Sequence, residues 1–372
     1  MRKKHFRIHP VLWILIDLIL IDAAINLIFA YPNDPRNITP SKLQQFFEYG
    51  RSIEGKLARM TRMTDNESAP ILKTGWLDDF DDETGPIDPL DPRPIVTVYG
   101  MSHAVILARE MDQINDSLII RRIGAPGGVP SWSYAAYLSD SRRQHSDIVV
   151  LGIMTRGIPL ICTTSGATNH FDSVHPYTYP RFYLNNGRLD AVWPPFVSRD
   201  GYRDFYYDKA KWEAYLSWLR DNDKYYDRFL FHKSLGDHSS LFRMLRRSVS
   251  FSMTRKMEAS VYDRLSGFKS DTEEINILRA VIVEFSQTAK RNGSIPIIYI
   301  VNNVFMSDHL FRALEPTLRS HDILYLSSHE LCDPNNPKNY DSSSHFVPSI
   351  NTELSKKMIR IIRDHHPRKR TS

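Results

Sequence analysis

The chain has 372 residues, of which 42% are hydrophobic and 24% are charged, so it can bury the core of one large domain with accessory pieces. Its formal net charge is only +5, and much of this excess lies in two short tails, at residues 2–7 and 368–370. Because no basic stripe alternates with aromatic residues along an element of groove size, we expect no nucleic-acid partner.

A nearly continuous apolar stretch runs from Val11 to Ala30 and follows a basic segment. Twenty helical residues are ~30 Å long, which matches the hydrocarbon core of a bilayer. The basic flank favours the cytoplasmic side, so we expect a single-pass membrane anchor with the rest of the chain outside. Two alternatives stay open: a cleaved signal peptide, and a buried core helix, which Asp17, Asp22 and Asn26 within the stretch would suit.

Three regions are predicted: a cytoplasmic tail and anchor over 1–35, a stalk helix and acidic linker over 36–94, and an α/β domain over 95–372. A Thr-Pro-Ser sequence and apolar residues at helical spacing predict the stalk helix at about 40–61. The acidic residues at 79–83 faintly resemble a calcium loop but lack its glycine and distant glutamate, so a solvated linker is expected.

From residue 95 onward, apolar strands alternate with helices, which is typical of a parallel sheet covered on both faces. Strands are expected at 95–99, 118–123, 148–153, 295–301 and 323–327, and helices at about 102–113, 131–142, 307–319 and 349–363. The pattern predicts an α/β fold: a three-layer αβα sandwich around a five-stranded parallel sheet.

An insertion at about 154–294 separates the third and fourth strands and is far longer than an ordinary crossover. Its first half is aromatic and expected to be loops. Its second half is expected to be helical around 208–233, 238–258 and 271–292. The aromatic residues are expected to serve packing, with a platform for stacking on sugar rings as the alternative. Cys162 and Cys332 are expected to be buried and unpaired, and no zinc motif is present.

Two short motifs at opposite ends of this domain carry the candidate chemistry. The first strand runs into Gly-Met-Ser-His at 100–103, and Asp341 and His345 lie in the last loop before the final helix. Open α/β sheets bind ligands at the carboxyl ends of their strands, so these groups are expected to meet there. Ser102 would be a nucleophile, His345 its general base and Asp341 the orienting acid of acyl chemistry.

Ordinary structural roles compete with each of these assignments. Ser102 could simply cap the helix that begins there, and His345 could be an ordinary loop histidine. His329 is the reserve candidate for the base, because it follows the fifth strand and has Asp333 nearby.

This order of blocks resembles the SGNH (GDSL-like) hydrolase superfamily, over residues 95–153 and 295–363. The resemblance implies an SGNH/flavodoxin-like fold with Ser102, His345 and Asp341 in the roles given above. It also implies an oxyanion hole formed by the backbone N–H groups of Ser102 and Gly127. Each donor of such a hole is typically worth ~10²–10³ in rate.

Three features depart from the family pattern. Met101 replaces the acid of the usual Gly-Asp-Ser block. In place of the usual Gly-x-Asn-Asp block, this chain has Met154 and Thr155 at the last two positions, so the asparagine that donates to the oxyanion is missing. Thr155 and Asn169 are the candidate substitutes for it. The last block holds one residue more between its acid and its histidine than the usual Asp-x-x-His.

The sequence therefore predicts a membrane-anchored, outward-facing serine acyl esterase or O-acyltransferase that forms an acyl-Ser102 intermediate. Its expected substrate is an ester, O-acetyl first, on a cell-surface or exported polysaccharide, or a small ester. No metal or organic cofactor is expected. Partner proteins in an export or acylation complex are expected. The alternative is an inactive SGNH-like subunit that binds polysaccharide or serves assembly, which the missing asparagine and aspartate favour.

Overall fold

The computed structural model describes residues 10–33, 35, 38–62, 74–80, 87–88 and 90–366. Of the acidic triplet at 79–83, Asp81 and Glu83 lie outside the described residues. The chain divides into two compact units: a first unit of Met1–Ser68, His170–Val174 and Asp227–Arg255, and a second unit of Ala69–Asn169, His175–Tyr226 and Lys256–Ser372. The first unit thus joins the predicted anchor and stalk to part of the predicted insertion.

A five-stranded parallel sheet forms the centre of the second unit. Its strands are β1 (Ile95–Gly100), β2 (Ile119–Gly124), β3 (Ile148–Met154), β8 (Ile295–Val301) and β9 (Leu324–Ser327), in the order β2-β1-β3-β8-β9. The predicted α/β class and five-stranded parallel sheet are confirmed. The strands were recognisable because central parallel strands are buried on both faces and read as continuous apolar runs.

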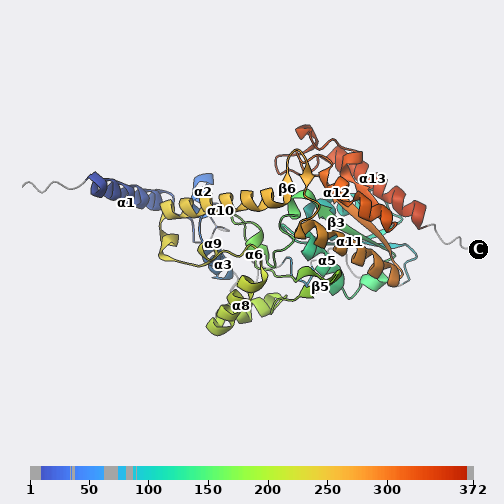
Figure 1. Ribbon diagram of the computed structural model, residues 1–372, viewed down its shortest axis with the longest axis horizontal. Coiled ribbons are helices and arrows are strands. Elements are labelled where there is room, and N and C mark those ends of the chain that lie inside the picture. Colours follow the sequence, from blue (N-terminus) through green and yellow to red (C-terminus); the bar gives the residue numbers. More distant parts are fainter. Residues whose placement is uncertain are drawn as a thin grey trace, which may run out of the picture. The chain divides into compact units, whose positions relative to one another are not determined.

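Helices cover both faces of this sheet, which gives three layers (Figure 1). α4 (Ser102–Ile114) and α13 (Pro348–His365) pack against one face, where Val98, Leu107 and Leu354 share one core. α5 (Pro130–Ser139) and α11 (Glu273–Arg291) pack against the other, and α12 (His309–Ser320) lies beside α11.

The first half of the insertion is more ordered than predicted. It forms α6 (Gly166–Asn169), a hairpin of β4 (Arg181–Asn185) and β5 (Arg188–Val192), and α7 (Arg199–Tyr207). The expectation of loops was therefore wrong at 181–192. Asn186 and Gly187 both take positive φ angles, 51° and 78°, as the two-residue turn of a hairpin requires.

Several aromatic residues of this half serve packing. Tyr177 and Tyr179 are fully buried, and Phe196 and Tyr202 stack among other rings. Trp193 and Tyr207 of the same half are exposed, at 44% and 63%.

The helix predicted at 208–233 is interrupted. α8 (Lys209–Asn222) ends before Asp223, and the next helix, α9, spans Arg228–Phe231. Asp223 leaves the helix because its buried carboxylate accepts bonds from the backbone N–H groups of Thr164 and Tyr225, at 2.8 and 3.0 Å. The helices predicted at 238–258 and 271–292 match α10 (Ser240–Val261) and α11, with a short hairpin, β6 (Tyr262–Asp263) and β7 (Gly267–Phe268), between them.

The first unit contains α1 (Pro10–Ile28), α2 (Lys42–Glu48), α3 (Ile53–Arg62), α9 and the first turns of α10. The prediction of a single stalk helix at 40–61 is wrong, because one helix ends at Glu48 and the next begins at Ile53. A Cβ at Gly50 would collide with the carbonyl group of Arg243, so the backbone of the break lies directly on α10. Ser52 then donates its N–H and hydroxyl to Asp237, at 2.9 and 2.6 Å.

α1 is long and apolar enough to cross a membrane, by length and composition alone. A signal sequence near the N-terminus would pass the same test. The helix has 19 residues, and none of its apolar window is buried inside the protein. A fully buried core helix, one of the two alternatives, is therefore excluded for these residues.

A buried ion pair lies against the second face of the sheet. Arg121 of β2 and Asp140, which ends α5, are 1% and 2% exposed, and the guanidinium donates to the carboxylate at 3.0 and 3.3 Å. The Tyr99 hydroxyl donates to the same carboxylate at 2.7 Å. Burial alone would raise the pKa of Asp140, but these bonds outweigh it and hold that pKa below its ordinary value.

We expect Asp140→Ala to lower the free energy of unfolding by about 3–5 kcal/mol, because it leaves Arg121 buried without its counter-charge. Urea unfolding of the full chain in detergent, followed by tryptophan fluorescence, measures the loss. The control is Asp112→Ala, which removes the half-exposed partner of the neighbouring Arg122 and should change stability by less than ~1 kcal/mol. Equal effects of the two variants would contradict this account.

Candidate functional site

The candidate site begins where α4 leaves the end of β1. A Cβ on Gly100 would lie 2.7 Å from the Cβ of Ala104, and one on Gly152 would lie 2.6 Å from that same atom. Small residues at these positions let the first turn of α4 rest on the ends of β1 and β3. Real Cβ atoms are essentially never so close, so a larger residue at either glycine would lift the helix.

Ser102 is the first residue of α4, and its side chain is exposed at this edge of the sheet. The helix cap is Met101, which makes no side-chain capping bond. Ser102 therefore does not serve as the N-cap, the ordinary role that competed with its assignment as a nucleophile. As a first-turn residue, it also has a backbone N–H without an intrahelical acceptor.

The structure brings Ser102 and His345 together across 243 residues of sequence. His345 Nε2 lies 2.7 Å from Ser102 Oγ, within the range of a strong hydrogen bond. This is the distance that a general base needs to remove a hydroxyl proton.

Asp341 reaches the His345 imidazole through a third residue. His345 Nδ1 lies 2.7 Å from the Oγ of Ser343, and Ser343 Oγ donates to Asp341 Oδ1 at 2.6 Å. The sequence interpretation had Asp341 as the orienting acid and overlooked Ser343. Asp341 is engaged by its own loop, because it also accepts the backbone N–H groups of Ser343 and His345, at 2.8 and 3.1 Å. The carboxylate is thereby held against its own loop.

These bonds determine which imidazole nitrogen carries the proton. A carboxylate can only accept, so the Ser343 hydroxyl donates to Asp341 and uses its lone pair to accept from His345 Nδ1–H. Nε2 is then the unprotonated nitrogen, and it faces the Ser102 hydroxyl. The bonds from Ser343 and from the loop backbone hold the pKa of Asp341 below its ordinary value, so it stays ionised at neutral pH.

The loop that holds these groups is tight. Its ends pair as a bridge between Tyr340 and Phe346, and the N–H of Asp341 donates to the carbonyl of His345 at 2.8 Å. Ser344 closes the turn with a φ of 65°. The extra residue relative to Asp-x-x-His is accommodated here, and it brings Ser343 between the acid and the base.

His103 packs behind His345 and was not assigned a functional role from the sequence. The two rings have centroids 4.8 Å apart, and Phe346 closes the other side of His103 at 5.0 Å. Burial lowers the pKa of His103 to about 3, with the nearby His345 and Arg156 adding to the effect. His103 is therefore neutral at physiological pH, so it fixes the orientation of His345 without adding a competing charge.

The predicted oxyanion residues divide into two groups. Gly100 and Gly124 are paired on β1 and β2, so Ser102 and Gly127 leave the same edge two and three residues later. Gly127 has a φ of 63°, which favours glycine, and its carbonyl accepts from Asn169 Nδ2 at 3.4 Å.

Asn169 is fixed beneath this loop. Its Oδ1 accepts the hydroxyls of Thr163 and Tyr179, at 2.6 and 2.8 Å. Its amide is thus a support for the Gly127 loop. Thr155 is fully buried, and its hydroxyl donates to the carbonyl of Val301 at 3.1 Å, so its proton is already used. The Thr155 hydroxyl is therefore not free as an oxyanion donor, and one N–H of the Asn169 amide is used by the Gly127 carbonyl.

His329, the reserve candidate for the base, has other contacts. Its Nδ1 lies 2.7 Å from Ser327 Oγ, and its ring packs on Phe311 at 4.7 Å.

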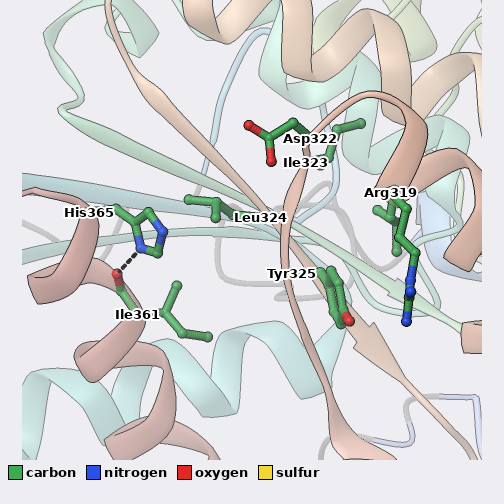
Figure 2. A pocket seen from close by; sticks show the side chains of 8 residues that line it. Arg319, Asp322, Ile323, Leu324, Tyr325, Ile361 and His365 are labelled. Atoms are coloured by element: carbon green, nitrogen blue, oxygen red, sulfur yellow. Dashed lines mark hydrogen bonds between the residues drawn. The ribbon is translucent and has the colours of Figure 1, made fainter.

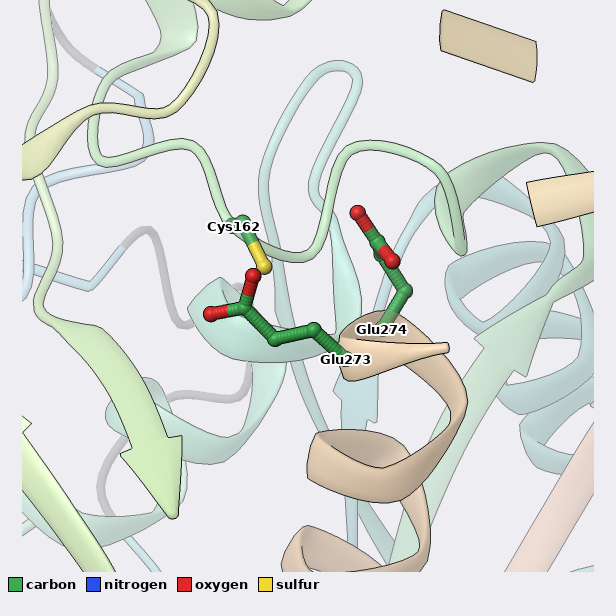
Figure 3. Close-up of side chains that lie close together, drawn as sticks. All are labelled: Cys162, Glu273 and Glu274. Atoms are coloured by element: carbon green, nitrogen blue, oxygen red, sulfur yellow. The ribbon is translucent and has the colours of Figure 1, made fainter. Parts of the chain in front are cut away.

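One cluster outside this site has side chains of metal-ligand type. Cys162, Glu273 and Glu274 present ligand atoms within 4.8 Å of one another (Figure 3). However, Lys224 donates to both carboxylates, at 3.0 and 2.7 Å, and Arg181 donates to Glu273 at 2.9 Å. Burial raises the pKa of the Cys162 thiol to about 12, so this thiol stays protonated. The donor set is already matched by cations and fits an internal ion network better than a metal. Cys162 and Cys332 are both free and buried, as predicted.

An open groove of about 400 Å³ lies at the other edge of the sheet (Figure 2). It is lined by the end of α12, the start of β9 and the end of α13, with Leu324, Ile361 and His365 among its residues. His365 is held by its Nδ1, which lies 2.9 Å from the carbonyl of Ile361. Because the sheet is parallel, the start of β9 is opposite to the edge that bears Ser102, and the groove is separate from the candidate site.

No protein-family model matches this chain, and none of the curated proteins matches it significantly.

We expect Gly152→Ala to destabilise the fold by ~1–3 kcal/mol and to slow labelling of Ser102 by a fluorophosphonate probe, because the new methyl group meets Ala104. Ala104→Gly in the same chain removes the opposing methyl group. The double variant should therefore recover labelling relative to Gly152→Ala alone. Additive losses in the double variant would show that the two positions are not in contact.

We expect Ser343→Ala to slow fluorophosphonate labelling of Ser102 by ~10²-fold, because His345 loses the group that fixes its tautomer. Asp341→Asn should cause a similar loss, and the double variant should be no slower than either single variant, since the three groups act as a unit. The control is Ser342→Ala, an exposed neighbour in the same loop, which should label at the parental rate. An unchanged rate for Ser343→Ala would exclude the relay.

Proposed function

We propose that the second unit is an SGNH-like serine acyl esterase or O-acyltransferase. The observation that carries the proposal is the continuous chain of bonds from Asp341 through Ser343 to His345 and on to Ser102. The Nε2 atom of His345 faces the Ser102 hydroxyl, and the nucleophile is exposed at the carboxyl edge of a parallel sheet. The strand order and the helices on both faces are compatible with an SGNH/flavodoxin-like fold.

In the proposed reaction, His345 Nε2 takes the proton of Ser102, and Oγ attacks the ester carbonyl. The backbone N–H groups of Ser102 and Gly127 receive the negative charge of the tetrahedral intermediate. His345 then returns the proton to the departing alcohol, which leaves an acyl group on Ser102. Water, or a sugar hydroxyl, attacks this ester with His345 again as the base, and the bond from the acyl carbon to Ser102 Oγ breaks as His345 returns the proton to Oγ.

We further propose that α1 anchors this unit on the outer face of a membrane. The basic segment before α1 favours a cytoplasmic N-terminus. An anchored esterase would act on a polymer at or near the cell surface, so the proposed substrate is the O-acyl, first the O-acetyl, group of an exported polysaccharide. No step of this chemistry uses a metal or organic cofactor.

One observation favours a second candidate, an inactive subunit that binds polysaccharide or serves assembly in an export or acylation complex. Asn169 and Thr155 use their polar atoms within the protein. The oxyanion donors proposed here are then those of the backbone. The loss of one such donor typically lowers a rate by ~10²–10³, which would leave a weak enzyme or none.

Intact mass measurement on the full chain with a small activated acetyl ester distinguishes the two candidates. We expect an acetyl adduct on the parental protein and none on Ser102→Ala, because the Ser102 hydroxyl is exposed and lies 2.7 Å from His345 Nε2. His345→Ala should form the adduct ~10²–10⁴-fold more slowly. If neither the ester nor a fluorophosphonate probe modifies Ser102, the binding-subunit function replaces the enzymatic one.

A further inference from the structure

The last two turns of α1 and the residue that follows them carry a stripe of two polar and two apolar side chains that faces the protein. Asp22, Ile25, Asn26 and Phe29 are half-buried, at the spacing of one helix face, whereas the neighbouring residues of these turns are exposed. Polar residues on an apolar helix of membrane-spanning length need partners, because lipid offers none. The first unit supplies those partners.

The partners come from the start of α10. Asp22 Oδ1 accepts the backbone N–H of Leu241 at 2.9 Å. Asn26 Oδ1 accepts from the Ser240 hydroxyl at 2.9 Å and from the guanidinium of Arg243 at 3.0 Å. Figure 1 shows α10 beginning beside α1. Asp22 therefore occupies a helix N-terminus, where a carboxylate is favoured by the free N–H groups and by the helix dipole.

The length of α1 determines the depth of these contacts. A bilayer core requires ~20 helical residues, and α1 has 19, so a spanning α1 has no turns to spare outside the core. Asp22 is six residues before Ile28, which at ~1.5 Å per residue is ~9 Å below the end of the helix. The start of α10 must then lie beside α1 within the outer part of the bilayer.

Four large apolar side chains are exposed around the start of α10, together with the polar Lys233 and His238. Leu235 is 89% exposed and Leu245 is 56% exposed, with Phe229 and Met244 partly exposed beside them. Gly236 lies directly on the ring of Phe242, and Phe229 packs on that ring at 5.7 Å, so the short helix η4 (Leu235–His238) is attached to the first turn of α10.

Asp237, Arg246 and part of the loop backbone of this region are paired internally, as a lipid environment requires, whereas His238 of η4 is exposed. Asp237 is fully buried and is bound by Ser52 and by Arg246, itself 1% exposed. The backbone N–H groups of Asp237 and Ser239 donate to carbonyls of the same loop, at 3.0 and 3.1 Å.

We propose that η4 and the first turns of α10 form a membrane-inserted wedge, docked on α1, whose Leu235 and Leu245 contact the acyl chains of the outer leaflet. This inference rests on the proposed membrane anchor and adds a second point of attachment to it. A single tether leaves a domain free to rotate above the membrane, whereas a docked wedge fixes how the first unit meets the lipid surface.

The test places an environment-sensitive nitrobenzoxadiazole label on the full chain in vesicles of phosphatidylcholine and phosphatidylglycerol. Leu235→Cys is the test site. Leu265→Cys is the matched control, a turn leucine of the second unit with 92% exposure. Ile19→Cys, on an exposed face of α1, reports on the anchor itself. The buried Cys162 and Cys332 should not react, and the unsubstituted chain measures any background.

We expect lipids with nitroxide-labelled acyl chains to quench the labels at Ile19 and Leu235 several-fold more than the label at Leu265, and both emissions to shift to the blue. Quenching at Ile19 with a solvent-like signal at Leu235 would overturn the wedge and leave the anchor intact. A blue-shifted label at Leu235 that these lipids do not quench would mean burial against a second copy or another protein, and would also overturn it. No lipid quenching at Ile19 would remove the proposed anchor, and the wedge with it.

Discussion

The position of the candidate nucleophile depends on one close approach, that of the first turn of α4 to the ends of β1 and β3. Gly100 and Gly152 leave room for Ala104, and this small contact sets both the entry of the helix and the exposure of Ser102. The GxSxG elbow of α/β-hydrolases has a glycine where this chain has Ala104. Here the glycines that make room for the close contact, Gly100 and Gly152, lie on the strands and not on the helix.

The base is positioned by a different principle, which is local hydrogen bonding. The Asp341 carboxylate organises its own turn through two backbone N–H groups and acts on His345 only through the Ser343 hydroxyl. Neutral His103 packs against the His345 imidazole from behind, and Phe346 packs against His103. The site therefore combines one charged group, one bridging hydroxyl and one rigid apolar wall.

Much of this architecture could be predicted from the sequence, and the exceptions have physical reasons. The five strands were visible because each is a continuous apolar run, and the meeting of Ser102 with His345 follows from the common edge of parallel strands. Ser343 could not be predicted, since its role depends on the positive φ of Ser344 and on loop bonds that leave no periodic pattern. The break of the stalk helix depends on contacts of Gly50 and Ser52 with residues almost 200 positions away, which local propensity cannot encode.

The stripe of Asp22, Ile25, Asn26 and Phe29 also bears on modularity. An anchor that only tethers a domain is interchangeable with any apolar helix of sufficient length. α1 instead has a preferred rotation about its own axis, because two of its side chains must meet the start of α10. Exchanging it for a generic apolar segment would keep the hydropathy and lose these contacts, so the helix behaves as a component of the first unit.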